Sequence, residues 1–191
     1  GTNSVIFSGR NSTQDGTVEY ELWVSDGTTE GTFMLKDIYS GDDNSSTPGY
    51  LTYLNGKIYF SAKDDNGKEL WVTDLTEDGT VMIKDIYEGE NDSNLRRLTP
   101  VGDKIFFEAT TQDHGAELWV TDGTADGTFM VKDINPGEDG SSINTGSGSC
   151  PYSYFHNNEY RTRGTDCFIS LGDSIFFAAD DDGLGGETPR L

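Results

Sequence analysis

Short acidic loops are the first candidates for chemistry in this chain, because closely spaced oxygen ligands beside a glycine suit Ca²⁺. Loops of this kind occur at residues 64–69 (DDNGKE), 113–117 (DHGAE) and 180–187. None of them has the twelve-residue DxDxDG-to-Glu spacing of an EF-hand. The predicted Ca²⁺ ligands are Asp64, Asp65, Asp180, Asp181 and Asp182. The alternative is that these residues form solvated acidic turns without a metal.

A polar insert at residues 140–168, GSSINTGSGSCPYSYFHNNEYRTRGTDCF, is the second candidate. It contains the only two cysteines of the chain, Cys150 and Cys167. These cysteines lack the His and Cys partners of a zinc site, so we expect a disulfide between them. The closed loop would contribute roughly 3 kcal/mol in the simple loop-entropy model.

We expect this insert to bind a ligand. Aromatic rings stack on sugars or on protein side chains, and arginine forks bind carboxylates or sulfates. The predicted ligand-binding residues are Tyr152, Tyr154, Phe155, His156, Tyr160, Arg161 and Arg163. The alternative is an inert insert that covers the core or a sheet edge.

Catalysis has little support in the sequence. The two histidines, His114 and His156, lie in unrelated loops, and no GxSxG, HExxH or phosphate-binding glycine-rich motif is present. Carboxylates are so numerous that choosing two as an acid–base pair would be arbitrary. We therefore expect a protein that is not an enzyme, with a glycan-active enzyme on a propeller scaffold as the less favoured alternative.

The scaffold that must position these candidates is a tandem repeat with a period of 48 residues. The stretch ELWV-S/T-D occurs at Glu21, Glu69 and, again, Glu117. Every tryptophan and every methionine of the chain recurs in register, at Trp23, Trp71, Trp119, Met34, Met82 and Met130. Lys-Asp pairs follow the same spacing and begin at Lys36, Lys84 and Lys132.

Four strand signals can be recognised in one repeat, at residues 21–24, 32–38, 50–54 and 57–62. Asn55-Gly56 lies between the last two and indicates a two-residue hairpin. The sequence therefore predicts that these four strands form one up-and-down antiparallel sheet. The predicted single domain consists of units 21–68, 69–116 and 117–186, with an additional N-terminal strand at 4–8.

Both faces of the expected strands carry apolar groups. Phe33 and Leu35 alternate with Met34 in one strand, and Trp23 opposes its apolar neighbours in another. A sheet wet on one face should instead alternate cleanly between apolar and polar residues. The pattern therefore predicts sheets packed between neighbouring sheets, as in an all-β, β-propeller-like array. A β-sandwich or a β-solenoid is the runner-up.

The repeat motif ELWxxDGTxxGTxxxKDI resembles the ELWxxDGT tandem repeats of secreted microbial proteins. The resemblance implies a propeller-like repeat architecture and export, and it carries no known reaction. It covers nearly the whole chain apart from the insert. Two departures are Leu75, where glycine is expected, and residues 187–191 (ETPRL), where ELWV should stand.

Structural roles are expected for the repeated polar residues. Asp26, Asp74 and Asp122 can accept hydrogen bonds from amides of their own turns, and the glycines that follow supply positive φ. The Lys-Asp pairs suggest ion pairing across strands or between neighbouring sheets.

The formal net charge of −21 argues against partners such as nucleic acid and anionic membranes. No stretch approaches the roughly 18 apolar residues of a membrane span. The sequence lacks a signal peptide and an initiator Met, so we expect a processed or partial product. Three N-glycosylation sequons, at Asn11, Asn44 and Asn91, fall in expected loops. With the cysteine pair they favour an extracellular or cell-surface protein.

The sequence thus predicts a non-catalytic extracellular module that acts by binding or assembly, with carbohydrate as one expected ligand class. The alternative is a structural subunit of a surface layer or filament. Expected partners are a glycan or protein at the cell surface, together with other copies or further repeats of a longer chain. The only cofactor considered is Ca²⁺.

Overall fold

The computed structural model describes residues 4–12, 16, 18–41, 44–138, 140–141, 152–156, 159–163, 169–171 and 174–176. Within these ranges every helix or strand element is a β-strand, and all the paired strands are antiparallel. No helix in this part of the chain has the length and hydropathy needed to cross a membrane. The predicted all-β class is confirmed.

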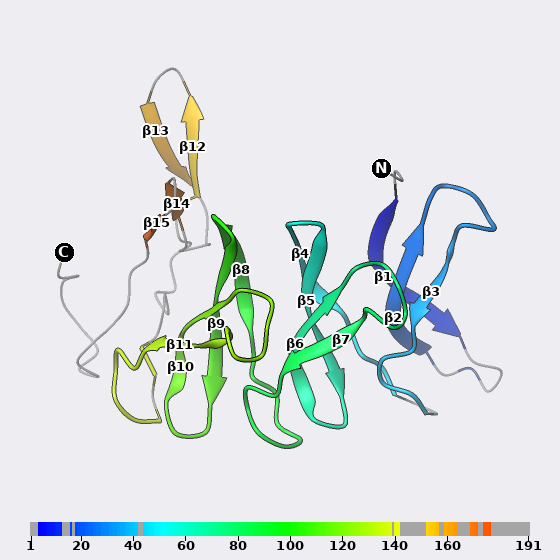
Figure 1. The fold of residues 1–191 in the computed structure, drawn as a ribbon, viewed down its shortest axis with the longest axis horizontal. Coiled ribbons are helices and arrows are strands. Elements are labelled where there is room, and N and C mark those ends of the chain that lie inside the picture. Colours follow the sequence, from blue (N-terminus) through cyan, green and yellow to red (C-terminus); the bar gives the residue numbers. More distant parts are fainter. Residues whose placement is uncertain are drawn as a thin grey trace.

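Three sheets follow one another along the chain (Figure 1). The first sheet contains β1 (Val5–Ser12), β2 (Val18–Ser25) and β3 (Phe33–Lys36). The second sheet contains β4 (Gly49–Leu54), β5 (Lys57–Asp64), β6 (Gly67–Thr73) and β7 (Val81–Lys84). The third sheet contains β8 (Arg96–Val101), β9 (Lys104–Thr111), β10 (Gly115–Thr121) and β11 (Phe129–Lys132). Strands adjacent in sequence are adjacent in each sheet.

Two separate hairpins lie beyond the third sheet in the sequence. β12 (Tyr152–His156) pairs with β13 (Glu159–Arg163), and β14 (Ile169–Leu171) pairs with β15 (Ser174–Phe176). Figure 1 shows the β12–β13 hairpin extending away from the sheets, above β14 and β15. The predicted insert therefore contains a hairpin of its own.

Short turns explain which strands pair. Asn55 and Gly56 both have positive φ, 50° and 83°, so they form the predicted two-residue hairpin between β4 and β5. A similarly short turn joins β5 to β6, so these strands also pair. The connection from β3 to β4, residues 37–48, is much longer and leads the chain to the next sheet.

The strands expected at 21–24, 32–38, 50–54 and 57–62 are present as β2 to β5, but they do not form one sheet. β2 and β3 pair with β1, whereas β4 and β5 pair with β6 and β7. The predicted grouping is wrong because the long β3–β4 connection carries the chain from the first sheet into the second. Strand propensity alone does not show which sheet a strand joins.

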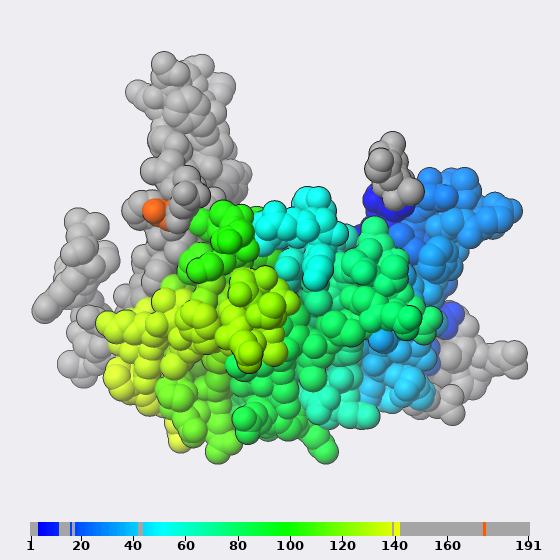
Figure 2. All heavy atoms as spheres, viewed as in Figure 1, coloured from blue at the N-terminus to red at the C-terminus, as the bar shows by residue number. Residues whose placement is uncertain are grey.

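The core lies between the sheets, which pack face to face. One cluster joins Leu22 and Leu35 of the first sheet to Phe60 and Trp71 of the second. A second cluster lies between the second and third sheets and consists of Tyr59, Leu70, Val72, Ile83, Ile86, Leu95, Ile105, Phe107, Ala109 and Trp119. The second sheet therefore contributes apolar side chains from both faces, as predicted. Figure 2 shows the three sheets packed into one continuous body.

The opening strands of successive sheets lie beside one another. β4 contacts β8, and β8 in turn contacts β14. The Thr52 hydroxyl of β4, which lies 2.9 Å from the Tyr50 carbonyl, is also within 3.4 Å of the Leu98 carbonyl of β8. Successive sheets therefore contact one another through their first strands as well as through their faces.

Candidate functional site

The repeated aspartates stabilise the turns that connect the last two strands of each sheet. Oδ1 of Asp26, Asp74 and Asp122 accepts the backbone N–H of the threonine two residues later, at 2.9, 3.0 and 2.9 Å. Bonds from that threonine's hydroxyl and N–H lower the pKa of each aspartate. Gly27 and Gly123 supply φ values of 90° and 92°. The predicted structural role of these turns is confirmed.

A buried glutamate opens each ELW stretch and anchors the loop that leaves the sheet. Glu21, Glu69 and Glu117 are 1%, 0% and 0% exposed. Glu69 Oε2 accepts the N–H of Ile86 at 2.9 Å, and Oε1 accepts the N–H of Ser93 at 3.0 Å. Burial raises the pKa of Glu69 to about 7, outweighing these bonds, which act in the opposite direction. Burial also raises the pKa of Glu21.

Lysines join neighbouring sheets at their outer edges. Lys36 Nζ donates to the carbonyl of Thr80 at 2.8 Å, and Lys84 Nζ donates to that of Thr128 at 2.9 Å. Each acceptor lies in the aspartate turn of the following sheet. The predicted link between neighbouring sheets is present, but the prediction of ion pairing is wrong for these lysines because their partners are main-chain carbonyls.

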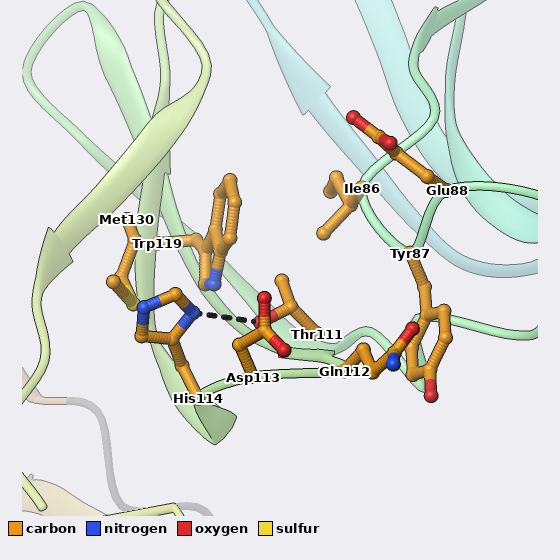
Figure 3. A pocket seen from close by; sticks show the side chains of 9 residues that line it. All are labelled: Ile86, Tyr87, Glu88, Thr111, Gln112, Asp113, His114, Trp119 and Met130. Atoms are coloured by element: carbon orange, nitrogen blue, oxygen red, sulfur yellow. Dashed lines mark hydrogen bonds between the residues drawn. The ribbon is translucent and has the colours of Figure 1, made fainter. Parts of the chain in front are cut away.

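A cavity of about 310 Å³ lies where the second sheet meets the third (Figure 3). Residues 86–88, which follow β7, form one side, and residues 111–114, the turn between β9 and β10, form another. Trp119 of β10 and Met130 of β11 complete the lining. Because Ile86 is bonded to Glu69, the buried glutamate positions the first residue of this wall.

Trp119 places a buried indole N–H in the wall of the cavity. Its side chain is 7% exposed, and its ring lies 6.4 Å from that of Phe107, between centroids. Its Nε1 has no hydrogen-bond partner among the described residues. Figure 3 shows this nitrogen on the side of the ring that faces Thr111 and Asp113. Leaving such a donor unpaired costs free energy, which a ligand acceptor would recover.

The corresponding tryptophans of the other two sheets also have an indole N–H without a hydrogen-bond partner. Nε1 of Trp23 and Nε1 of Trp71 are also buried and unpaired within the described part of the chain. An unpaired indole is therefore a property of the repeat. At Trp119 this indole lines a cavity that also presents several acceptors.

Acceptor groups dominate the polar lining of the cavity. Glu88 and Asp113 contribute carboxylates, which only accept, while Tyr87, Thr111, Gln112 and His114 can both donate and accept, and no Lys or Arg of the described residues lines the cavity. His114 Nδ1 is 3.1 Å from the Thr111 hydroxyl, a hydrogen bond that orients the imidazole. The two carboxylates disfavour an anionic ligand. They suit a ligand that presents several hydroxyl or other N–H and O–H donors.

The sequence-predicted metal residues are not gathered in the described part of the chain. Asp64 caps its own turn, since its Oδ1 accepts the N–H of Asn66 at 2.8 Å, and Asp65 is exposed. No group of three or more His, Cys, Asp or Glu side chains that could hold a metal occurs among the described residues. Asp180, Asp181 and Asp182 lie outside those residues, so Ca²⁺ binding stays a prediction.

The predicted recognition residues of the insert fall on the β12–β13 hairpin. In its backbone register Tyr152 lies opposite Arg163, and Tyr154 lies opposite Arg161. The remaining members, Phe155, His156 and Tyr160, belong to the same two strands. Cys150 and Cys167 lie outside the described residues, so the disulfide stays a prediction.

Of the three sequons, Asn44 and Asn91 lie outside strands, as expected. Asn11 instead lies in β1, opposite Glu19 of β2. Its predicted loop position is wrong because β1 and β2 remain paired as far as Ser12 and Val18.

Sequence reasoning missed the cavity, although it had noted His114 and Asp113 in an acidic loop. The cavity needs residues 86–88 from another sheet, and no local pattern links these segments. A detectable signal did exist for the buried anchor, because a glutamate recurs at the start of an otherwise apolar strand in all three copies.

Comparison with models of protein families, with curated proteins and with solved structures finds no match to this chain. The site itself must therefore carry the functional argument.

Proposed function

We propose that this chain is a non-catalytic extracellular binding module built from propeller-like repeats, and that the cavity beside Trp119 binds a neutral carbohydrate. Support for the architecture comes from three antiparallel sheets that pack face to face, with β4, β8 and β14 adjacent in turn. The 48-residue motif and its resemblance to secreted ELWxxDGT repeat proteins add to this support. The sequons and the cysteine pair favour an extracellular setting.

The observation that carries the ligand class is the unpaired indole N–H of Trp119 in the wall of a cavity that presents two carboxylates; a small rotation of the ring would expose this N–H to a ligand. A sugar ring offers both kinds of partner, since its oxygens accept from the indole and its hydroxyls donate to Glu88 and Asp113. The hydrocarbon face of a sugar would contact the apolar lining provided by Ile86 and Met130. A charged ligand fits less well, because an anion meets two carboxylates and a simple cation leaves the indole donor unpaired.

A screen of neutral, acidic and amine-bearing glycans, followed by calorimetric titration of each ligand retained, tests the proposal. Trp119→Phe keeps an aromatic ring and removes the N–H, so we expect affinity for a neutral glycan to fall by about 10-fold or more. Trp71→Phe is the matched control, because it removes the same unpaired N–H one sheet away. Absence of any glycan binding, or equal losses in both variants, would contradict the proposed site.

The insert provides a competing location for the same function. Tyr154→Ala and Arg161→Ala are expected to leave cavity binding unchanged. If these two changes abolish glycan binding while Trp119→Phe does not, the ligand belongs on the β12–β13 hairpin instead. Ca²⁺ is proposed only as a stabiliser, so a chelator should lower the melting temperature and added Ca²⁺ should restore it.

A catalytic alternative is tested with the same ligands. Glu88 and Asp113 are the two carboxylates that a glycan-active enzyme could use in this cavity. We expect bound glycan to be recovered intact. Release of new reducing ends, lost on Glu88→Gln, would overturn the non-catalytic part of the proposal.

A further inference from the structure

The chain contains two Asn-Gly dipeptides, both in the second sheet and both followed by lysine. Asn55-Gly56 precedes Lys57, and Asn66-Gly67 precedes Lys68. Such a dipeptide can react with itself, because glycine has no side chain to hinder the approach of its amide nitrogen to the asparagine side chain. The residues that take part are the same in the two stretches, so a difference in their reactivity should come from the fold.

The turn between β4 and β5 leaves its asparagine free. Asn55 is exposed, and its side chain makes no hydrogen bond within the described part of the chain. The hairpin register pairs Leu54 with Lys57, so neither central residue of the turn belongs to the ladder. A Cβ placed on Gly56 would have no neighbouring atom within 4 Å, so the space beside this residue is open. Only the turn itself has to rearrange for the two groups to meet.

The turn between β5 and β6 holds both of the corresponding groups. The Asn66 amide donates to both carboxylate oxygens of Asp64, at 3.3 and 3.2 Å, and the Asn66 N–H donates to Oδ1 at 2.8 Å. Gly67 is buried and pairs with Asp64, and a Cβ on it would lie 2.0 Å from the Asn91 carbonyl oxygen. The side chain and the backbone that follows it are therefore held by separate contacts.

We propose that Asn55 is a site of spontaneous deamidation in the folded chain, and that Asn66 is protected by its contacts. The Gly56 nitrogen loses its proton to hydroxide and attacks Cγ of Asn55, forming a C–N bond. The bond from Cγ to the side-chain nitrogen breaks, and this nitrogen takes a proton from water and leaves as ammonia. Water then opens the cyclic imide at either carbonyl, which leaves aspartate or isoaspartate and adds one negative charge. The reaction is independent of ligand binding beside Trp119.

The two products have different consequences for the hairpin. Aspartate keeps the turn, because Asp-Gly suits positive φ at both central positions as Asn-Gly does. Isoaspartate routes the main chain through its side-chain carbon and so lengthens the connection between β4 and β5. Leu54, directly before the turn, packs against the core between the second and third sheets, and β4 also contacts β8. Isoaspartate at position 55 should therefore loosen the contact between these two sheets.

Incubation of the folded chain at mildly alkaline pH, followed by proteolysis and mass spectrometry, tests the selectivity. Chromatography separates the aspartate and isoaspartate forms of each peptide. We expect conversion at Asn55 to exceed that at Asn66 by about 10-fold or more, because Asn66 must first give up hydrogen bonds to a carboxylate. Similar conversion at the two sites in the folded chain overturns the proposal.

The same chain unfolded in urea is the control for the local sequence. Without the fold, Asn55 and Asn66 should convert at similar rates. A preference for Asn55 that is as large in urea as in the folded chain would assign the difference to neighbouring residues and overturn the proposal. An Asn55 that reacts in urea but stays intact in the folded chain would also overturn it.

Two variants of residue 55 test the consequence for stability. Asn55→Gly suits the same turn and has no side-chain amide to lose, so incubation should produce no change at this position. Asn55→Asp supplies the aspartate product alone and should melt like the fresh wild-type chain. The acidic fraction of incubated wild type that carries isoaspartate should melt at a lower temperature than Asn55→Asp. Equal melting temperatures would contradict the loosening of the hairpin.

Discussion

The loops that leave the second and third sheets begin with nearly the same sequence but are anchored differently. Glu69 accepts N–H bonds at 2.9 and 3.0 Å from Ile86 and Ser93, which are well separated in the loop after β7. Glu117 accepts bonds at 3.2 and 3.3 Å from the adjacent residues 134–135. The repeated sequence therefore fixes the first anchor, whereas the course of each loop decides whether the glutamate also binds a second, more distant residue. Ser141, the counterpart of Ser93, bonds the Ala116 carbonyl instead.

The largest expected effect tests this difference directly. Glu69→Ala leaves the buried N–H of Ile86 without an acceptor and removes one of the two acceptors of the Ser93 N–H, so we expect the free energy of unfolding to fall by about 3 kcal/mol. Glu117→Ala should cost only about 1 kcal/mol, because its bonds are longer and hold a single stretch of chain. Urea denaturation followed by tryptophan fluorescence measures both values. Glu90→Ala, which alters an exposed side chain, provides the baseline for losing a negative charge.

Equal losses at Glu69 and Glu117 would show that both loops depend on the glutamate to the same extent. The difference between the two anchors would then have no energetic consequence. A loss at Glu90 as large as that at Glu69 would instead point to net charge as the cause.

The pH dependence of stability provides the second test. Because the pKa of Glu69 is about 7 in the folded chain and 4.5 ordinarily, the folded state binds an additional proton between these values. Stability contributed by this group is therefore complete below pH 4.5, decreases as the pH rises towards 7, and levels off above it. The total change is at most about 3 kcal/mol.

Glu69→Gln isolates that contribution, since an amide does not titrate. We expect this variant to be less stable at every pH, because its NH₂ group meets a backbone N–H. We also expect its stability to vary less with pH than that of the wild type. The difference between the two chains, measured by urea denaturation from about pH 5 to pH 8, should shrink as the pH rises. A constant difference would mean that Glu69 is already ionised throughout this range.

The sequence predicted those features that depend on neighbouring residues. The aspartate turns and the Asn55-Gly56 hairpin follow from residue types within a few positions of one another. Apolar residues on both faces of one strand correctly predicted the double packing of the second sheet. These features could be predicted from the sequence because the interacting groups recur at short, fixed spacing.

Features that join distant segments of the chain could not be predicted in this way. Glu69 reaches partners 17 and 24 residues away, so its role as an anchor depends on the path of the loop. The cavity requires residues 86–88, which follow one sheet, and residues 111–114 of the next to line the same space. Sheet membership was mispredicted for the same reason, since strands at similar spacing were assigned to one unit without knowledge of the β3–β4 connection.

The smallest expected effect concerns the turn of the second sheet, where Leu75 stands at φ 72° in place of glycine. A left-handed conformation costs a non-glycine residue roughly 1–2 kcal/mol, and the added freedom of glycine in the unfolded chain offsets part of this. Leu75→Gly should therefore raise the free energy of unfolding by about 0.5 kcal/mol. The reciprocal change, Gly27→Leu in the first sheet, has room for a side chain but should lower stability by a similar amount or more. Thermal denaturation of both variants measures the pair, and a destabilised Leu75→Gly chain would show that the packing of Leu75 outweighs its backbone strain.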